Sequence, residues 1–312
     1  MKIFITGGTG FLGKPLLKKL LGKGHQVLIL KKDGEKISKE FLKSKSRISF
    51  LNGNLQNINK LLPKIKSFKP EVGIHLAWEG IPSADLELNL KNLNGGLNCL
   101  ETLAKAGVKR IFVAGSCHEY GEPRNVHRDA LRGNPGKKVS ETNPLNPFNM
   151  LYAAKIALYF LGSKIAETHN VKLIWGRIGF VYGPGQRKAS LIPHLLNSIQ
   201  KNEEPVLKNP KGGNDFIYVD DVAGAISALI KKKNLRTNEI FNIGSGKLTG
   251  VMEIVKIIYR QAKLSVPKHL KDVKKPEGFC LGISKIKFEV GWQPKVNIDL
   301  GIKKTIGHYK SK

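Results

Sequence analysis

Several side chains capable of proton or nucleophile chemistry follow the apolar stretch 109–115, namely Ser116, Cys117, His118 and Glu119. If that stretch is a strand of an open α/β sheet, its carboxyl end is where ligands bind. A serine near histidine and glutamate could support hydrolysis through a covalent intermediate. The sequence lacks the G-x-S-x-G turn that presents such a serine. We therefore expect Ser116 to donate a hydrogen bond to a substrate carbonyl or hydroxyl.

A glycine turn near the N-terminus has the chemistry of an anion site. Residues 6–13 read T-G-G-T-G-F-L-G and connect an apolar run at 2–6 to a segment with helical spacing. A helix that begins after a tight turn directs free N–H groups and its dipole at one point. A purely structural turn is the alternative, but the position between strand and helix favours a dinucleotide cradle. The cofactor contacts predicted here are Gly7, Thr9, Gly10, Phe11, Leu12 and Gly13.

Lysines follow the second predicted strand, 26–30, where an acidic residue would bind the adenosine ribose of NAD(H). Lys31 and Lys32 could instead pair with a 2′-phosphate, so the sequence favours NADP(H), with NAD(H) as the alternative. Lysines are mostly surface residues, and simple exposure is the competing interpretation.

The ends of the next two predicted strands supply further contacts. Asn54 is expected to hydrogen-bond an adenine edge, and Leu55 to pack on the adenine ring. After the fourth strand, Leu76 and Ala77 are expected to contact the cofactor, and Trp78 to line the substrate side. These positions share one sheet edge, so they predict a single elongated site.

The order of apolar and amphipathic segments predicts a doubly wound parallel sheet of Rossmann type with a smaller C-terminal substrate lobe. We expect residues 1–180 to form the dinucleotide-binding domain and 181–312 the substrate lobe, part of which returns to the first domain. The predicted strands are 2–6, 26–30, 47–51, 72–77, 109–115, 171–178 and 241–243. The predicted helices are 11–22, 56–67, 85–106, 148–168, 220–230 and 251–262.

Composition narrows the class of protein. The 312 residues carry a net charge of +29, spread along the chain as lysines rather than gathered in an arginine-rich patch. Nucleic-acid binding is therefore the weaker interpretation, and an anionic small substrate the stronger one. Three scattered cysteines predict neither a disulfide framework nor a metal site. With no apolar run near 20 residues and a strand beginning at Lys2, we expect no membrane span, no signal peptide and a cytoplasmic location.

The sequence resembles the extended short-chain dehydrogenase/reductase superfamily, in particular its NAD(P)-dependent sugar-nucleotide epimerases and dehydratases. The resemblance covers essentially the whole chain. Its motifs are the glycine turn, I-H-L-A, G-S-C-H-E-Y-G, V-Y-G-P-G at 181–185, D-F-I-Y-V-D-D-V-A at 215–223, F-N-I-G-S-G at 241–246 and I-S-K-I-K-F-E-V-G-W at 283–292. It implies the fold, the use of NAD(P) and a Ser/Thr–Tyr–Lys catalytic set. Those roles fall on Ser116, Tyr152 and Lys155, and Lys155 would also hold the cofactor ribose.

The spacing of tyrosine and lysine departs from the family pattern. The family has Y-x-x-x-K, whereas Tyr152 and Lys155 are three residues apart. Both spacings keep the two side chains on one helix face. The pair could therefore still cooperate, through a local bulge or an altered register, or the site could be impaired.

Other departures concern the substrate. Family dehydratases carry an Asp-Glu pair after the Ser/Thr; Cys117 and His118 stand there, so dehydration is disfavoured and both residues are predicted to contact substrate. Asn214 replaces an arginine that holds the substrate's pyrophosphate in the family, and only Lys274 and Lys275 are available for a second one. Arg177, Gln186 and Asn214 itself are predicted to contact substrate.

We expect an oxidoreductase or epimerase that carries out 4-keto reduction or 4-epimerisation of a nucleotide sugar by hydride transfer. The alternative is a catalytically weak protein that binds NADP(H) as a sensor or scaffold. The resemblance also implies a homodimer through helices 85–106 and 148–168.

Overall fold

A seven-stranded sheet forms the centre of the protein in the computed structural model, which describes all residues except 36, 38–40, 42–45, 123–137, 271–275 and 311–312. Its paired strands all run parallel, in the order β10-β6-β5-β4-β1-β2-β3. The strands are β1 (Lys2–Thr6), β2 (Gln26–Lys31), β3 (Ile48–Asn52), β4 (Val72–His75), β5 (Arg110–Ala114), β6 (Lys172–Ile178) and β10 (Asn238–Ile243). The chain moves outward from β1 to β3 and then crosses back to β4. The β1–β4 junction is therefore the point at which a doubly wound sheet binds ligands.

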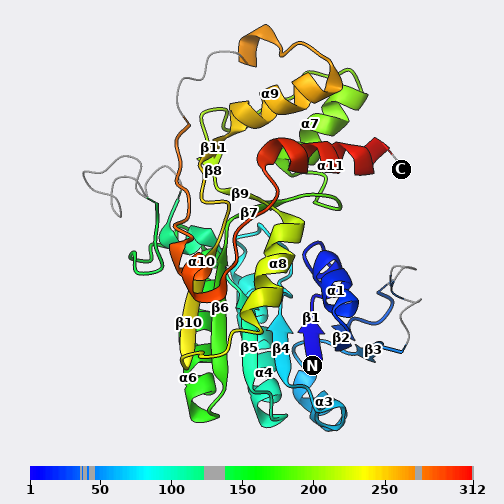
Figure 1. The fold of residues 1–312 in the computed structure, drawn as a ribbon, viewed down its shortest axis with the longest axis vertical. Helices are drawn as coiled ribbons and strands as arrows, with labels where there is room; N and C mark the ends of the chain where they lie inside the picture. The colour runs from blue at the N-terminus through cyan, green and yellow to red at the C-terminus, as the bar shows by residue number, and fades with distance from the viewer. Residues whose placement is uncertain (36, 38–40, 42–45, 123–137, 271–275, 311–312) are drawn as a thin grey trace.

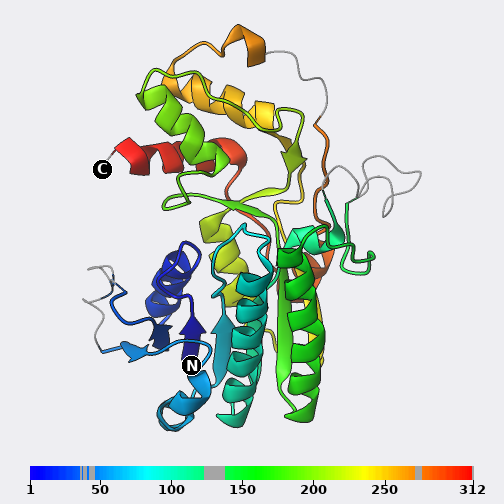
Figure 2. The same ribbon diagram turned by 180° about the vertical axis from the view of Figure 1, so that it is seen from behind.

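Helices cover both faces of this sheet (Figures 1 and 2). One face carries α1 (Gly13–Gly22), α8 (Val219–Leu229) and α10 (Ser284–Val290). The other carries α3 (Leu62–Phe68), α4 (Leu86–Lys105) and α6 (Met150–Thr168). Because both faces are covered, most residues of the central strands β1, β4, β5 and β6 are buried. The predicted doubly wound sheet is confirmed.

A smaller lobe stands beyond the carboxyl ends of the strands (Figure 1). Its helices are α7 (Leu191–Gln200), α9 (Val251–Ala262) and α11 (Ile298–Lys310), which share their own apolar core. Two small sheets accompany them, β7 (Phe180–Tyr182) with β9 (Phe216–Tyr218), and β8 (Gly213–Asn214) with β11 (Thr249–Gly250). The chain enters the lobe after β6 and returns to the large sheet through α8 and β10.

Local residues explain where the helices begin and end. The Asp85 side chain accepts a hydrogen bond from the Leu88 N–H at 2.8 Å, which starts α4 close to the predicted position. Gly107, with φ +86°, follows its end. The predicted helix 56–67 is instead the 3₁₀ turn η1 (Ile58–Leu61) followed by α3, because a proline stands in the first turn of α3. No helix within the described residues is long and apolar enough to cross a membrane.

Candidate functional site

The glycine turn between β1 and α1 is too tight for larger residues. Gly7 has φ +70°, and a Cβ on Gly13 would lie 2.2 Å from the Gly7 carbonyl oxygen. Within the described residues no side chain caps the start of α1, and its first turn contains no acidic residue. The nearby Thr9 hydroxyl donates to the Glu35 carboxylate. The helix N-terminus and its N–H groups therefore fit the pyrophosphate of a dinucleotide.

A cavity of about 780 Å³ runs from this turn to the N-terminus of α6. Its walls come from the ends of β1, β4 and β5 on one side and from the loop after β7 on the other. It brings together fourteen of the predicted site residues: Gly7, Gly10, Phe11, Leu12, Gly13, Leu76, Ala77, Trp78, Ser116, Cys117, His118, Tyr152, Lys155 and Gln186. The glycine turn and a set of proton-bearing side chains thus face the same space.

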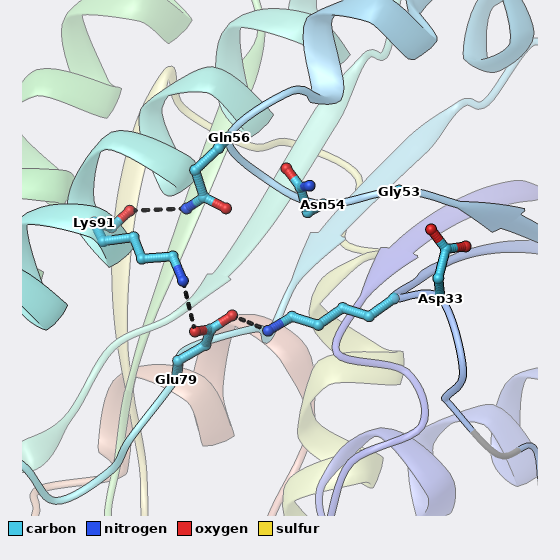
Figure 3. Close-up of a pocket in the computed structure, with 7 residues that line it drawn as sticks. Asp33, Gly53, Asn54, Gln56, Glu79 and Lys91 are labelled. Carbon is cyan, nitrogen blue, oxygen red and sulfur yellow. Dashed lines mark hydrogen bonds and ion pairs between the residues drawn. The ribbon is translucent and has the colours of Figure 1, made fainter.

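The other predicted cofactor residues lie at the ends of β2 and β3. Asn54 lines a second pocket, of about 240 Å³, together with Lys32 (Figure 3). Lys31 ends β2, and its ammonium donates to the Lys32 carbonyl at 3.4 Å. Leu55 is half-buried and packs into the core beneath α4. This region lies beside the glycine turn, at the ends of the next two strands of the sheet, where the sequence predicts the adenosine contacts.

Tyr152 lies in the first turn of α6, where Asn149 caps the helix by accepting from the Tyr152 N–H at 3.3 Å. The Tyr152 hydroxyl is 2.8 Å from His118 Nδ1, and the Phe148 ring packs against the phenol. Burial raises the pKa of the Tyr152 hydroxyl and lowers the pKa of His118 to about 4, although the Asn214 side chain beside His118 opposes the second shift. At neutral pH the hydrogen bond therefore joins a neutral phenol to a neutral imidazole.

Lys155 has different partners. Its ammonium donates to the Ala114 carbonyl at 2.9 Å and lies 4.3 Å from the centre of the Trp78 ring. Burial lowers the pKa of Lys155 to about 8, and the Glu119 carboxylate partly opposes this. Helix α6 is α-helical throughout residues 150–168, so Tyr152 and Lys155 keep their three-residue spacing without a bulge.

Leu151 holds the position four residues before Lys155. Its side chain is only 2% exposed and lines the cavity. The resembled family has its tyrosine at this spacing, and an aliphatic side chain cannot exchange a proton. In this chain, therefore, an aliphatic residue stands at the family's tyrosine position, and the tyrosine is the next residue, Tyr152. Counting back from Lys155 could have identified Leu151 as a site residue before the structure was known.

Ser116 and Cys117 begin the 3₁₀ turn η2 (Cys117–Tyr120), which follows β5. The Ser116 hydroxyl accepts from the His118 N–H at 3.2 Å, and the Ser116 N–H donates to Glu119 at 2.7 Å. This capping box fixes the serine at the cavity wall and leaves its hydroxyl proton available for donation. Burial raises the pKa of the Cys117 thiol, which is therefore protonated and a poor nucleophile.

Arg177 lies beneath the cavity, contrary to its predicted contact with substrate. Its guanidinium is 2% exposed and donates to the Glu119 carboxylate at 2.9 Å. Trp175 donates to the same carboxylate from two residues earlier on β6. Residues two apart share one face of a strand, so Arg177 lies on the same side of β6 as the buried Trp175 and does not line the cavity. Its role is to support the η2 turn.

Gln186 and Arg187 extend over the cavity mouth from the loop after β7. The Gln186 amide donates to the Val181 carbonyl at 3.0 Å, and the exposed Arg187 donates to the Ile81 carbonyl. The Phe180 ring, which the sequence analysis did not single out, also lines this end. Lys274 and Lys275 lie outside the described residues. Arg187 is thus a guanidinium on the described wall that could meet a phosphate.

Comparisons with known proteins find a matching family model and similar chains. A family model described as NAD dependent epimerase/dehydratase family matches residues 3–244. The chain is 28% identical over 330 residues to a putative UDP-glucose 4-epimerase of Methanocaldococcus jannaschii, covering 99% of this chain and 98% of the relative. It is 26% identical over 330 residues to a probable dTDP-glucose 4,6-dehydratase of Sinorhizobium fredii, covering 99% and 93%. The structure of a dTDP-glucose 4,6-dehydratase of Bacillus anthracis in complex with NAD superposes with a TM-score of 0.84 at 21% identity, covering 100% and 97%.

The relatives include dehydratases as well as epimerases. The prediction that dehydration is disfavoured therefore gains no support from them.

Proposed function

The chain belongs to the NAD dependent epimerase/dehydratase family, and we propose that it is an NAD(P)-dependent oxidoreductase or epimerase of a nucleotide-activated sugar. The reaction we assign is 4-keto reduction or 4-epimerisation by hydride transfer. The observation that carries this proposal is the single cavity in which the glycine turn, Ser116 and Tyr152 meet. The relatives named for UDP- and dTDP-sugars support the substrate class.

The cofactor would lie along the cavity from the glycine turn to Lys155. When bound, its nicotinamide supplies or accepts the hydride. The N-terminus of α1 would hold the pyrophosphate, Ala77 leaves room beside it, and the Lys155 ammonium would hold the nicotinamide ribose. Lys31, which ends β2, and Lys32, which follows it, would favour NADP(H) over NAD(H) where their ammonium groups are free to bind a 2′-phosphate.

Tyr152 is proposed as the acid and base. In the reducing direction its hydroxyl gives a proton to the carbonyl oxygen, and in the oxidising direction it takes one from the sugar hydroxyl. Ser116 would donate a hydrogen bond to the same oxygen. His118 Nδ1 lies on the Tyr152 hydroxyl, so in its Nδ1–H tautomer it would donate to the phenolate that proton transfer leaves behind. In this chain the imidazole would then do work that the family assigns to lysine.

The substrate's sugar and nucleotide would occupy the end of the cavity walled by Trp78, Phe180 and Gln186, with Arg187 near the phosphates. Cys117 and His118 close the floor of that space. The sugar would therefore sit against aromatic and neutral polar groups, which suits stacking and hydroxyl hydrogen bonds.

The test is turnover across a panel of UDP- and dTDP-sugars and their 4-keto forms, each with NAD(H) and NADP(H). A reductase consumes the dinucleotide in proportion to product, whereas a 4-epimerase converts sugar with a catalytic amount of it. Conversion of a 4-keto sugar or of a C4 epimer is the expected result. Loss of water at C5–C6 as the main reaction would replace the proposal with dehydration.

A sensor or scaffold is the second candidate, favoured by the separate partners of Tyr152 and Lys155. A sensor would bind the dinucleotide without any change in its redox state on the whole panel. An epimerase or reductase would show transient or lasting hydride transfer with at least one member.

We also propose a homodimer through the outer faces of α4 and α6. Large apolar side chains are exposed there: Leu86, Leu90, Met150, Phe160 and Leu161. Light scattering coupled to size-exclusion chromatography should give twice the chain mass. Leu161→Lys should shift it to the monomer if this face forms the interface.

A further inference from the structure

The second pocket contains a carboxylate held between two ammonium groups. Glu79, in the loop after β4, forms an ion pair with Lys32 after β2 and another with Lys91 on α4, the latter at 3.2 Å (Figure 3). The two lysines and the carboxylate all line the pocket that Asn54 also lines. The Glu79 carboxylate thus already pairs with the lysines in the pocket where we propose that the adenosine binds.

The backbone around Glu79 is fixed from one buried side chain. Asn92, which is 5% exposed on α4, accepts from the Glu79 N–H at 2.9 Å and donates to the Glu79 carbonyl at 3.0 Å. The pKa of Glu79 is lowered, first by its hydrogen bond with Lys32 and also by Lys91, so the carboxylate is charged at neutral pH. Because the loop is fixed by these hydrogen bonds, the Glu79 charge keeps one position in the pocket.

This arrangement changes what Lys31 and Lys32, the two lysines at the end of β2, can bind. A 2′-phosphate is an anion that needs a free cation; Lys32 is ion-paired with Glu79, whereas the Lys31 ammonium donates only to the Lys32 carbonyl among the contacts of the described residues. A bound 2′-phosphate would also face the Glu79 charge across a small pocket. A 2′-hydroxyl is neutral and can donate to a carboxylate, so it meets neither penalty.

We propose that Glu79 sets the cofactor preference of this chain, because its ion pairs keep Lys32 and Lys91 from binding the 2′-phosphate. It lowers the preference for NADP(H) that the lysines after β2 would otherwise give, and it keeps NAD(H) binding competitive. The inference rests on the proposed dinucleotide site and adds the residue that selects between the two dinucleotides.

The experiment measures the dissociation constants of NADP⁺ and NAD⁺ by titration calorimetry with the full chain. Glu79→Gln should tighten NADP⁺ roughly tenfold and change NAD⁺ less than about threefold, since it releases two ion pairs. Glu87→Gln is the matched control, because Glu87 is an exposed glutamate of α4 outside the pocket and its loss changes the net charge equally. The control should leave the ratio of the two constants unchanged.

A double-mutant cycle shows whether Glu79 acts through Lys32. Lys32→Met should weaken NADP⁺ binding more in the Glu79→Gln background than in the native chain, because only there is the ammonium free for phosphate. An equal effect in both backgrounds, or an unchanged ratio in Glu79→Gln, would overturn the inference while leaving the dinucleotide site in place. Failure of the native chain and all variants to bind either dinucleotide would overturn both proposals.

Discussion

The two ends of the main cavity are built from different kinds of groups. The end that we propose to bind the cofactor (the cofactor end) depends on backbone: a left-handed Gly7, a Gly13 without room for a Cβ, and the N–H groups that begin α1. The end that we propose for proton transfer (the proton-transfer end) depends on side chains with specific partners: Tyr152 contacts His118, and Lys155 donates to the Ala114 carbonyl. A backbone site tolerates change in the surrounding side chains, whereas proton transfer depends on the register of a single helix. This explains how the chain keeps the family's glycine turn while it departs from the family's tyrosine–lysine spacing.

The largest expected effect is at the proton-transfer end. Tyr152→Phe removes the proposed acid and base, and kcat/KM should fall about 10³-fold. Cofactor affinity should stay within about twofold, because the hydroxyl lies away from the glycine turn. Steady-state kinetics and dinucleotide titration on the same preparation separate the two quantities. An activity within a few fold of the native chain would remove Tyr152 from the reaction.

The matching change at the cofactor end is Gly13→Ala. A Cβ there would lie 2.2 Å from the Gly7 carbonyl, so the turn must shift, at a cost of about 1–3 kcal/mol in the free energy of unfolding and with loss of dinucleotide binding. Gly22→Ala in the last turn of the same helix is the control, since a Cβ there meets nothing within 4 Å. Denaturant unfolding and titration of the dinucleotide measure both effects. Equal behaviour of the two variants would show that close approach at Gly13 is unimportant.

A smaller effect connects the two ends through Lys155. Because burial lowers its pKa to about 8, the ammonium is mostly charged at pH 7 and mostly neutral at pH 9. If that charge holds the dinucleotide, affinity should fall about tenfold between these two pH values. Lys155→Met should bind more weakly at pH 7 and lose this pH dependence. A native chain whose affinity is flat over the range would show that the charge makes no contact with the cofactor.

How much of the fold and of the site can be predicted from the sequence depends on the kind of contact. The glycine turn, the strand ends and α6 are recognisable because they follow local periodicity and spacing. Arg177 was misplaced because a strand end alone does not say which face a side chain takes; its neighbour Trp175, two residues away and buried, carried that information. The Glu79–Lys32 and His118–Tyr152 contacts join residues 47 and 34 positions apart, and only the folded chain brings them together.

Exchanging residues 151 and 152 tests whether the proton-transfer end works in its present register. The variant Leu151→Tyr/Tyr152→Leu restores the four-residue spacing to Lys155 and removes the hydroxyl from His118. Turnover is measured with the best substrate of the panel, and dinucleotide affinity serves as the check on folding. We predict unchanged dinucleotide affinity and at least a hundredfold loss of turnover, because the tyrosine hydroxyl would no longer lie where it can give its proton to the substrate oxygen. A large gain in turnover would contradict this and show that the native chain is an impaired member of its family.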